Sequence, residues 1–440
     1  MLVVKTLSSV ATKIIKTGFY LCVVLALSNQ ARYFAEQKGF IEPKLASDYT
    51  IAATYTPSAK GAVQTTVEYC SEIVAVNDSS NSSGITQTNL TFNDSWFTND
   101  SKTYNHEMAT TCSILSAVCN SESHYYSDVY GSSAYAEEAL TTLGFSNIQT
   151  DSYQMRSHTL DQIGSLFSGS YDVAAYAFAS KDITSSFGND GTTLIFIGIR
   201  GSYGAEWLSN IKMLNNTTPH FDHKGFKAAE EDVKAALEAY ILDIGVNPAN
   251  IKLLITGHSR GGAIANLLAA DFNNGTTLFE DAISTSDVFA YTYASPSVTQ
   301  NETRTNPRHN NVFNVVNPSD IVCQLPLTSW NYGRYGTVVS LPTTGSYNFE
   351  TVRNNMQTNH AQNTNYYNPC STEDLSKLAS FEEYTSKAIP NAESLFTPPG
   401  AFATLQALYS IDYSKALYVH CPDSYIAWMQ ALEERNLSFK

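Results

Sequence analysis

A serine between two glycines follows a short apolar run near the middle of the chain. Residues 251–256 read IKLLIT, and residues 257–261 read GHSRG. A serine at a sharp turn from strand to helix raises its hydroxyl above the sheet. The positions two residues away must then be small, because strand and helix approach closely there. Gly257 and Gly261 meet this requirement, so the pattern predicts that Ser259 is a nucleophile at a nucleophile elbow. The alternative is a hydroxyl in a tight turn.

A serine nucleophile needs a base, and the base needs an acid that orients it. Asp320 stands just after the apolar run 311–317, where a strand end would carry a catalytic carboxylate. The alternative is an aspartate that only forms a turn. Two downstream histidines are candidates for the base. His360 lies in a polar segment, whereas His420 lies between two apolar helical stretches, which favours His420. His258, beside the nucleophile, is expected to pack elsewhere.

Acyl transfer also requires donors for an oxyanion. Ser202 follows the apolar run 192–201 and can offer both an N–H and a hydroxyl. Arg260 would begin the helix after Ser259, and a helix N-terminus carries a partial positive charge. The sequence therefore predicts an oxyanion hole formed by Ser202 and the backbone N–H of Arg260. Arg200 is expected to be a structural anchor, with a substrate clamp as the alternative.

Apolar runs and amphipathic stretches alternate along most of the chain. Residues 226–245 form an amphipathic helical pattern that Gly245 ends, and residues 260–272 predict a buried helix. Residues 105–145 also look helical. Strands are predicted at 171–180, 192–201, 251–256, 288–294 and 311–317. This alternation predicts an α/β fold with a mainly parallel central sheet covered by helices. Residues 48–76 read as one or two strands, and residues 77–104 as polar loop with room for a short strand.

Composition limits the classes of partner. The net charge is −15, so binding to nucleic acid is not expected. Residues 18–28 are an uncharged run after three lysines, typical of a signal peptide; an uncleaved anchor is the alternative. Six cysteines would remain after cleavage, an even number compatible with disulfides in an exported protein. No cysteine or histidine spacing suggests a metal site, and no cofactor is expected.

Five segments of the chain resemble class 3 lipases, the fungal-lipase-like α/β-hydrolases, especially bacterial-type members. They are IGIRGSYGAEWLSN, HKGFKAAEEDV, ITGHSRGGAIANLLAA, NVVNPSDIVCQLPLTSWNYGRYG and VHCPDSYIAWM. The resemblance spans about residues 170–430. It implies an α/β-hydrolase fold in which Ser259 is the nucleophile, Asp320 the orienting acid, His420 the base and Ser202 an oxyanion donor.

The chain departs from the compact fungal lipases in two places. An insertion at about 343–400, which includes His360, separates Asp320 from His420, and residues 48–104 have no counterpart. Residues 203–222 stand where the family carries its lid, but their pattern is not strongly amphipathic. If the triad assembles, the loops with Cys323 and Cys421 become neighbours, so a disulfide between these cysteines is a further hypothesis.

These observations predict a secreted serine ester hydrolase with a signal peptide at 1–31, an N-terminal extension at 32–104 and a catalytic domain at 105–440. The resemblance implies a lipid ester as substrate, with triacylglycerol first and with a phospholipid, a small soluble ester or a feruloyl-type ester as alternatives. No stable protein partner is implied. An alternative that is not an enzyme is a surface adhesin or binding module on a hydrolase scaffold. A third interpretation is an acyltransferase that uses the same serine.

Overall fold

The computed structural model describes residues 62–128, 134–151, 174–183, 191–201, 222–278, 281–391 and 411–440, together with a few positions between 393 and 406. The predicted signal peptide at 1–31, the first part of the extension, Ser202 and the lid candidate up to residue 221 lie outside these residues. No helix in the part of the chain that is described is both long and apolar enough to cross a membrane.

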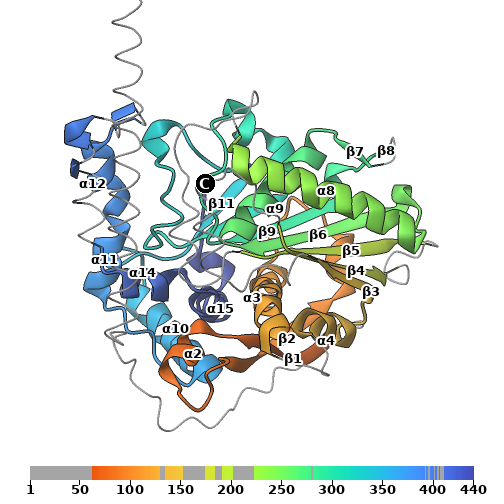
Figure 1. Ribbon diagram of the computed structural model, residues 1–440, viewed down its shortest axis with the longest axis horizontal. Coiled ribbons are helices and arrows are strands. Elements are labelled where there is room, and N and C mark those ends of the chain that lie inside the picture. The colour runs from red at the N-terminus through yellow and green to blue at the C-terminus, as the bar shows by residue number, and fades with distance from the viewer. Residues whose placement is uncertain are drawn as a thin grey trace, which may run out of the picture.

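An eight-stranded sheet forms the centre of the described structure (Figure 1), in the order β12-β11-β10-β9-β6-β5-β4-β3. The five strands from β5 to β11 in this order pair in parallel, while β3, β4 and β12 pair antiparallel with their neighbours. The strands are β3 (Ser146–Asp151), β4 (Tyr176–Asp182), β5 (Thr193–Ile199), β6 (Ile251–His258), β9 (Val288–Tyr293), β10 (Val312–Val316), β11 (Thr337–Ser340) and β12 (Ser438–Phe439). A short separate pair, β7 (Thr277–Leu278) and β8 (Asp281–Ala282), lies outside this sheet.

Helices cover both faces of the sheet. On one face pack α8 (Lys224–Ile244) and α9 (Arg260–Asn273), and on the other α3 (His106–Asp128), α4 (Tyr135–Thr142) and α15 (Pro422–Ala431), as Figure 1 shows. The side chains of β6 alternate accordingly, since Leu253 and Ile255 join the core with α8 and α9 while Leu254 joins the core with α3. The predicted α/β-hydrolase fold with a mainly parallel, helix-covered sheet is confirmed.

Several helices end or begin as the sequence predicts. Gly245 closes α8 in the left-handed conformation, with φ of 68°, which glycine adopts at little steric cost. The helix α9 is buried along almost its whole length, as its nearly uniform apolar sequence predicts. These two helices and the strand β6 between them place residues 257–261 at the carboxyl edge of the sheet.

The N-terminal region differs from its prediction. It forms a hairpin of two nine-residue antiparallel strands, β1 (Ala62–Cys70) and β2 (Ile85–Asn93), with the short helix α2 (Glu72–Asn77) between them. The second strand is longer than the short strand predicted within 77–104, and residues 72–76 are helical rather than extended. The hairpin packs against α3 and shares one hydrophobic core with α15.

The insertion after Asp320 is helical in the described residues. It contains α10 (Phe349–Thr364), α11 (Thr372–Ala379) and α12 (Phe381–Ala388), followed later by α14 (Tyr413–His420). In α10 the buried Phe349, Val352, Met356 and His360 follow one another at spacings of three and four, the spacing of one helix face. The segment around His360 is polar in sequence, but it forms a helix in which His360 is buried.

Candidate active site

The turn after β6 holds Ser259 in a strained conformation. Its φ and ψ are 56° and −123°, outside the regions that side chains with a Cβ normally adopt. A Cβ at Gly257 would lie 2.5 Å from the carbonyl of Gly261, and a Cβ at Gly261 would lie 2.2 Å from the carbonyl oxygen of Ile199. Both glycines are therefore required by backbone contact, as the elbow predicts. The Ser259 N–H donates to the carbonyl of Tyr293 at 2.8 Å.

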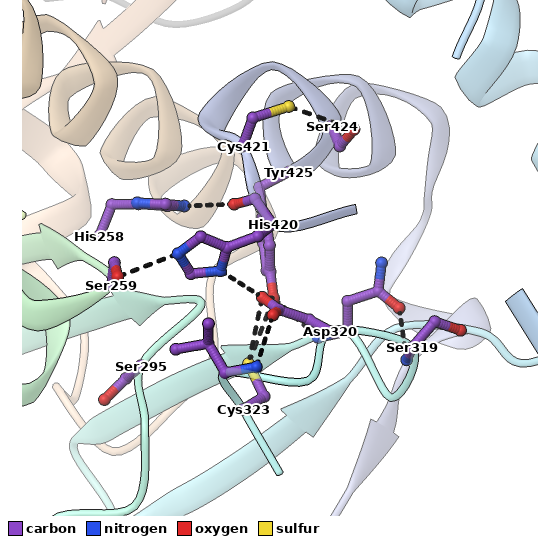
Figure 2. A network of polar contacts seen from close by, with 12 residues as sticks. His258, Ser259, Ser295, Ser319, Asp320, Cys323, His420, Cys421, Ser424 and Tyr425 are labelled. Carbon is purple, nitrogen blue, oxygen red and sulfur yellow. Dashed lines mark hydrogen bonds and ion pairs between the residues drawn. The ribbon is translucent and has the colours of Figure 1, made fainter. Parts of the chain in front are cut away.

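Three side chains far apart in the sequence meet at this turn (Figure 2). The distance from His420 Nε2 to Ser259 Oγ is 2.9 Å, and that from His420 Nδ1 to Asp320 Oδ2 is 2.8 Å. Ser259 follows β6, Asp320 lies in the loop after β10, and His420 is the last residue of α14. The three predicted triad residues are thus joined by two hydrogen bonds, and His360 is not among them.

Asp320 is buried and accepts several hydrogen bonds. Besides His420, the Tyr425 hydroxyl donates to its Oδ2 at 2.8 Å and the Val322 N–H to its Oδ1 at 2.9 Å. Burial by itself raises the pKa of Asp320, but the charge of His420 and these hydrogen bonds outweigh it, so the pKa lies below its usual value. Asp320 therefore stays an anion that can orient His420 and stabilise its protonated form.

Tyr425 belongs to the site although its sequence position did not predict it. Its hydroxyl accepts a hydrogen bond from the Asn317 N–H at 3.1 Å while it donates to Asp320. It thereby connects α15 to both Asn317 and Asp320 in the loop that carries the acid. The available signal was its position five residues after His420, in the same sequence block.

Replacing Tyr425 with phenylalanine should lower kcat by about tenfold, since the Asp320 carboxylate loses a donor and shifts relative to His420. The variant should also be about 1–3 kcal/mol less stable, because the buried Asn317 N–H loses this partner. Ester hydrolysis kinetics and urea denaturation measure the two effects. An unchanged kcat would show that Tyr425 does not support the acid.

His258 has a role that its sequence position did not predict. It packs as predicted, but its Nε2 also lies 2.8 Å from the carbonyl oxygen of His420, and the two rings are 5.0 Å apart. Only a protonated Nε2 can donate to a carbonyl, so this ring carries its hydrogen there. Burial, together with the nearby His420, lowers the pKa of His258 to about 3. His258 is therefore a neutral donor that fixes the backbone of His420.

This low pKa predicts acid destabilisation. Between the ordinary histidine pKa of 6.5 and about 3, the unfolded chain binds a proton at His258 that the folded chain excludes. The stability that neutral His258 contributes to the folded state is fully present above pH 6.5. As the pH is lowered through this window, the free energy of unfolding falls by about 1.4 kcal/mol per pH unit. In His258→Phe, the loss of stability between about pH 7 and about pH 5 should be about 2 kcal/mol smaller than in the wild type. Identical pH profiles from urea denaturation would contradict this assignment.

The predicted disulfide between Cys323 and Cys421 is wrong, because both are free thiols. The Sγ of Cys323 lies 3.3 Å from the Tyr425 hydroxyl, whereas the Sγ of Cys421 lies 3.4 Å from the carbonyl oxygen of Tyr418. Figure 2 shows the two thiols on opposite sides of the group formed by Tyr425 and Asp320. The loops are neighbours, but the thiols face different surroundings.

The predicted oxyanion donors are only partly described. Arg260 is the first residue of α9, so its N–H is at the helix end with partial positive charge. Gly201 lies against the elbow, since a Cβ there would be 2.5 Å from the carbonyl oxygen of His258, and its N–H donates to Asn120 at 2.8 Å. Ser202, the next residue, lies outside the described residues. Arg200 is buried, in agreement with a structural anchor.

Comparison with known proteins gives partial matches. Residues 196–330 match the family described as lipase (class 3). A lipase of Rhizomucor miehei is 32% identical over 114 residues, and the secreted mono- and diacylglycerol lipase 1 of Fusarium solani is 30% identical over 109 residues. These matches cover 25% and 24% of this chain, and the chain spans 30% of each relative's length. Both relatives are fungal, so the expectation of a bacterial-type member is not supported.

Solved structures of lipases are also similar in part. One, described as a triacylglycerol lipase with a serine protease triad, is 26% identical with a TM-score of 0.32. The match covers 38% of this chain and 62% of that lipase. A mutant form of MDLA from Penicillium cyclopium is 19% identical with a TM-score of 0.37, and the match covers 56% of this chain and 83% of that protein.

Proposed function

We propose that this chain is a secreted serine ester hydrolase of the class 3 lipase type, acting on lipid esters with triacylglycerol as the foremost substrate. The observation that carries the proposal is the continuous hydrogen-bonded chain from Ser259 through His420 to Asp320, at 2.9 and 2.8 Å, on a strained elbow. The match of residues 196–330 to class 3 lipases supports it. The leader pattern of residues 1–31 and the name of the secreted Fusarium relative support export.

In the proposed reaction, Ser259 Oγ attacks the ester carbonyl while His420 Nε2 takes its proton. Asp320 holds the imidazole by Nδ1 and stabilises the imidazolium that forms. The bond to the alkoxy oxygen then breaks, and His420 gives its proton to the leaving alcohol. A water molecule, deprotonated by His420, attacks the acyl-enzyme and releases the acid, which restores Ser259.

The tetrahedral intermediate needs donors for its oxygen. We assign these to the backbone N–H of Arg260, at the start of α9, and to Ser202, which directly follows Gly201 beside the elbow. Each such donor contributes about 3 kcal/mol to the stability of the transition state. We further assign the catalytic unit to residues 105–440, with the hairpin of the extension packed on it.

Hydrolysis of an emulsified triacylglycerol and of p-nitrophenyl esters with short and long acyl chains tests this function. The wild type should hydrolyse the emulsion and the long-chain ester, and Ser259→Ala should hydrolyse neither. Preference for soluble short-chain, phospholipid or feruloyl esters would replace the lipase assignment with an esterase of that class. A wild type that hydrolyses none of these, with or without an interface, would favour a binding module on a hydrolase scaffold.

A further inference from the structure

The corner between α14 and α15 carries His420, and two segments distant from it in the sequence contact it. His420 ends α14, and Asp423 lies three residues later in the first turn of α15. Pro422 restricts the backbone between them. A displacement of Asp423 is therefore transmitted over a short, stiff connection to His420. Besides His258, which donates to the His420 carbonyl, side chains of the N-terminal hairpin and of the insertion after Asp320 contact this corner.

Side chains of the hairpin contact the corner. The Tyr69 hydroxyl, from β1, donates to Asp423 Oδ1 at 2.9 Å, and Asn77 Nδ2, from α2, donates to the Tyr418 hydroxyl at 3.0 Å. Tyr69 is 0% exposed and Asp423 is 1% exposed. Removing a hydrogen bond between such buried groups costs stability, because the carboxylate cannot form a hydrogen bond with water in its place.

The insertion contacts the same corner from another side. Asn368 Nδ2 lies 3.1 Å from the Tyr418 carbonyl oxygen and 2.8 Å from Ser424 Oγ. Burial raises the pKa of Asp423, and the electrostatic interaction with His360 and the hydrogen bonds from Ser71 and Tyr69 oppose that shift. The groups that offset the burial of Asp423 thus belong to the hairpin and the insertion.

We propose that Tyr69 is a positioning residue for His420 and acts through Asp423. The N-terminal hairpin then serves to hold His420 at hydrogen-bonding distance from Ser259. This inference rests on the proposed ester hydrolase function. The base must be held to a fraction of an ångström, and misplacement by about 1 Å can reduce a rate about 10²-fold. Loss of the Tyr69 hydroxyl leaves Asp423 with one donor fewer and releases the corner from β1.

The test compares Tyr69→Phe with Tyr335→Phe. Tyr335 is a matched control, because it is buried and its hydroxyl also donates to an aspartate, Asp222 at 3.0 Å, but it packs against α9 on the other face of the sheet. For both variants, kcat and KM on a soluble p-nitrophenyl ester and the Tm are measured. The low-field proton resonance of the His420–Asp320 hydrogen bond is recorded as well. Asn77→Ala, at a partly exposed position, is a second variant if Tyr69→Phe does not fold.

Tyr69→Phe should lower kcat about tenfold with KM within about twofold, and it should shift or broaden the low-field resonance. Tyr335→Phe should leave kcat and the low-field resonance at wild-type values, even if its Tm falls. A Tyr69→Phe variant with a lower Tm but unchanged kcat and resonance would overturn the proposal and leave the hairpin a structural role. The resonance needs no substrate, so it tests the positioning even if the wild type hydrolyses no ester, which would refute the proposed function separately.

Discussion

Replacing Ser259 with alanine should reduce kcat for ester hydrolysis by about 10⁴–10⁶-fold, the size of effect expected when a triad nucleophile is removed. The substitution deletes only the Oγ that lies 2.9 Å from His420 Nε2. Both residues carry a Cβ, so the strain of the positive φ at this position is the same in the variant. We therefore expect an inactive protein with nearly unchanged stability.

Initial rates on a p-nitrophenyl ester, together with thermal unfolding, measure the effect of this substitution. Ser116→Ala is a suitable control, because Ser116 is also buried but donates within α3 to Ser113. The control should retain wild-type activity. Residual activity of Ser259→Ala above about one per cent of wild type would mean that another residue attacks the ester.

Replacing Asp320 with asparagine should lower kcat by about 10⁴-fold. The carboxylate oxygen Oδ2 accepts from both His420 Nδ1 and the Tyr425 hydroxyl. An amide keeps the size of the group but supplies no charge to stabilise the imidazolium. Its NH₂ group can also favour the tautomer that leaves Nε2 unable to accept the Ser259 proton. The substrate affinity should change little, since Asp320 is buried behind His420.

The kcat and KM of Asp320→Asn on the same ester measure this effect. Asp287→Asn is the control, because Asp287 pairs with Lys252 at 2.6 Å near the amino end of β9, far from the elbow. The control should keep the wild-type kcat. A decrease of less than about tenfold in Asp320→Asn would show that another acid orients His420.

The elements that carry the site were predictable because their sequences repeat a strong local pattern. An apolar run bounded by Gly257 predicts β6, and the amphipathic stripe that stops at Gly245 predicts α8. The backbone approach at the elbow requires Gly257 and Gly261, so the sequence reveals that geometry directly. Asp320 and His420 could be selected because each stands at the end of an apolar element.

Other features depend on contacts that no local pattern encodes. The buried face of α10 carries Val352, Met356 and His360, but the many asparagines and glutamines around these positions make the segment read as polar in the sequence. Tyr425 and Tyr69 are ordinary aromatic residues until the fold places their hydroxyls on Asp320 and Asp423. The disulfide was wrong for a similar reason, since closeness of two loops does not decide where their thiols point.

The most direct test of the central proposal is covalent labelling with an alkyl fluorophosphonate, followed by intact mass spectrometry and peptide mapping. We expect one phosphonate per chain, on Ser259, with no label in Ser259→Ala and much slower labelling in His420→Ala. No label on the folded wild type, or a label on a residue other than Ser259, would contradict the proposal.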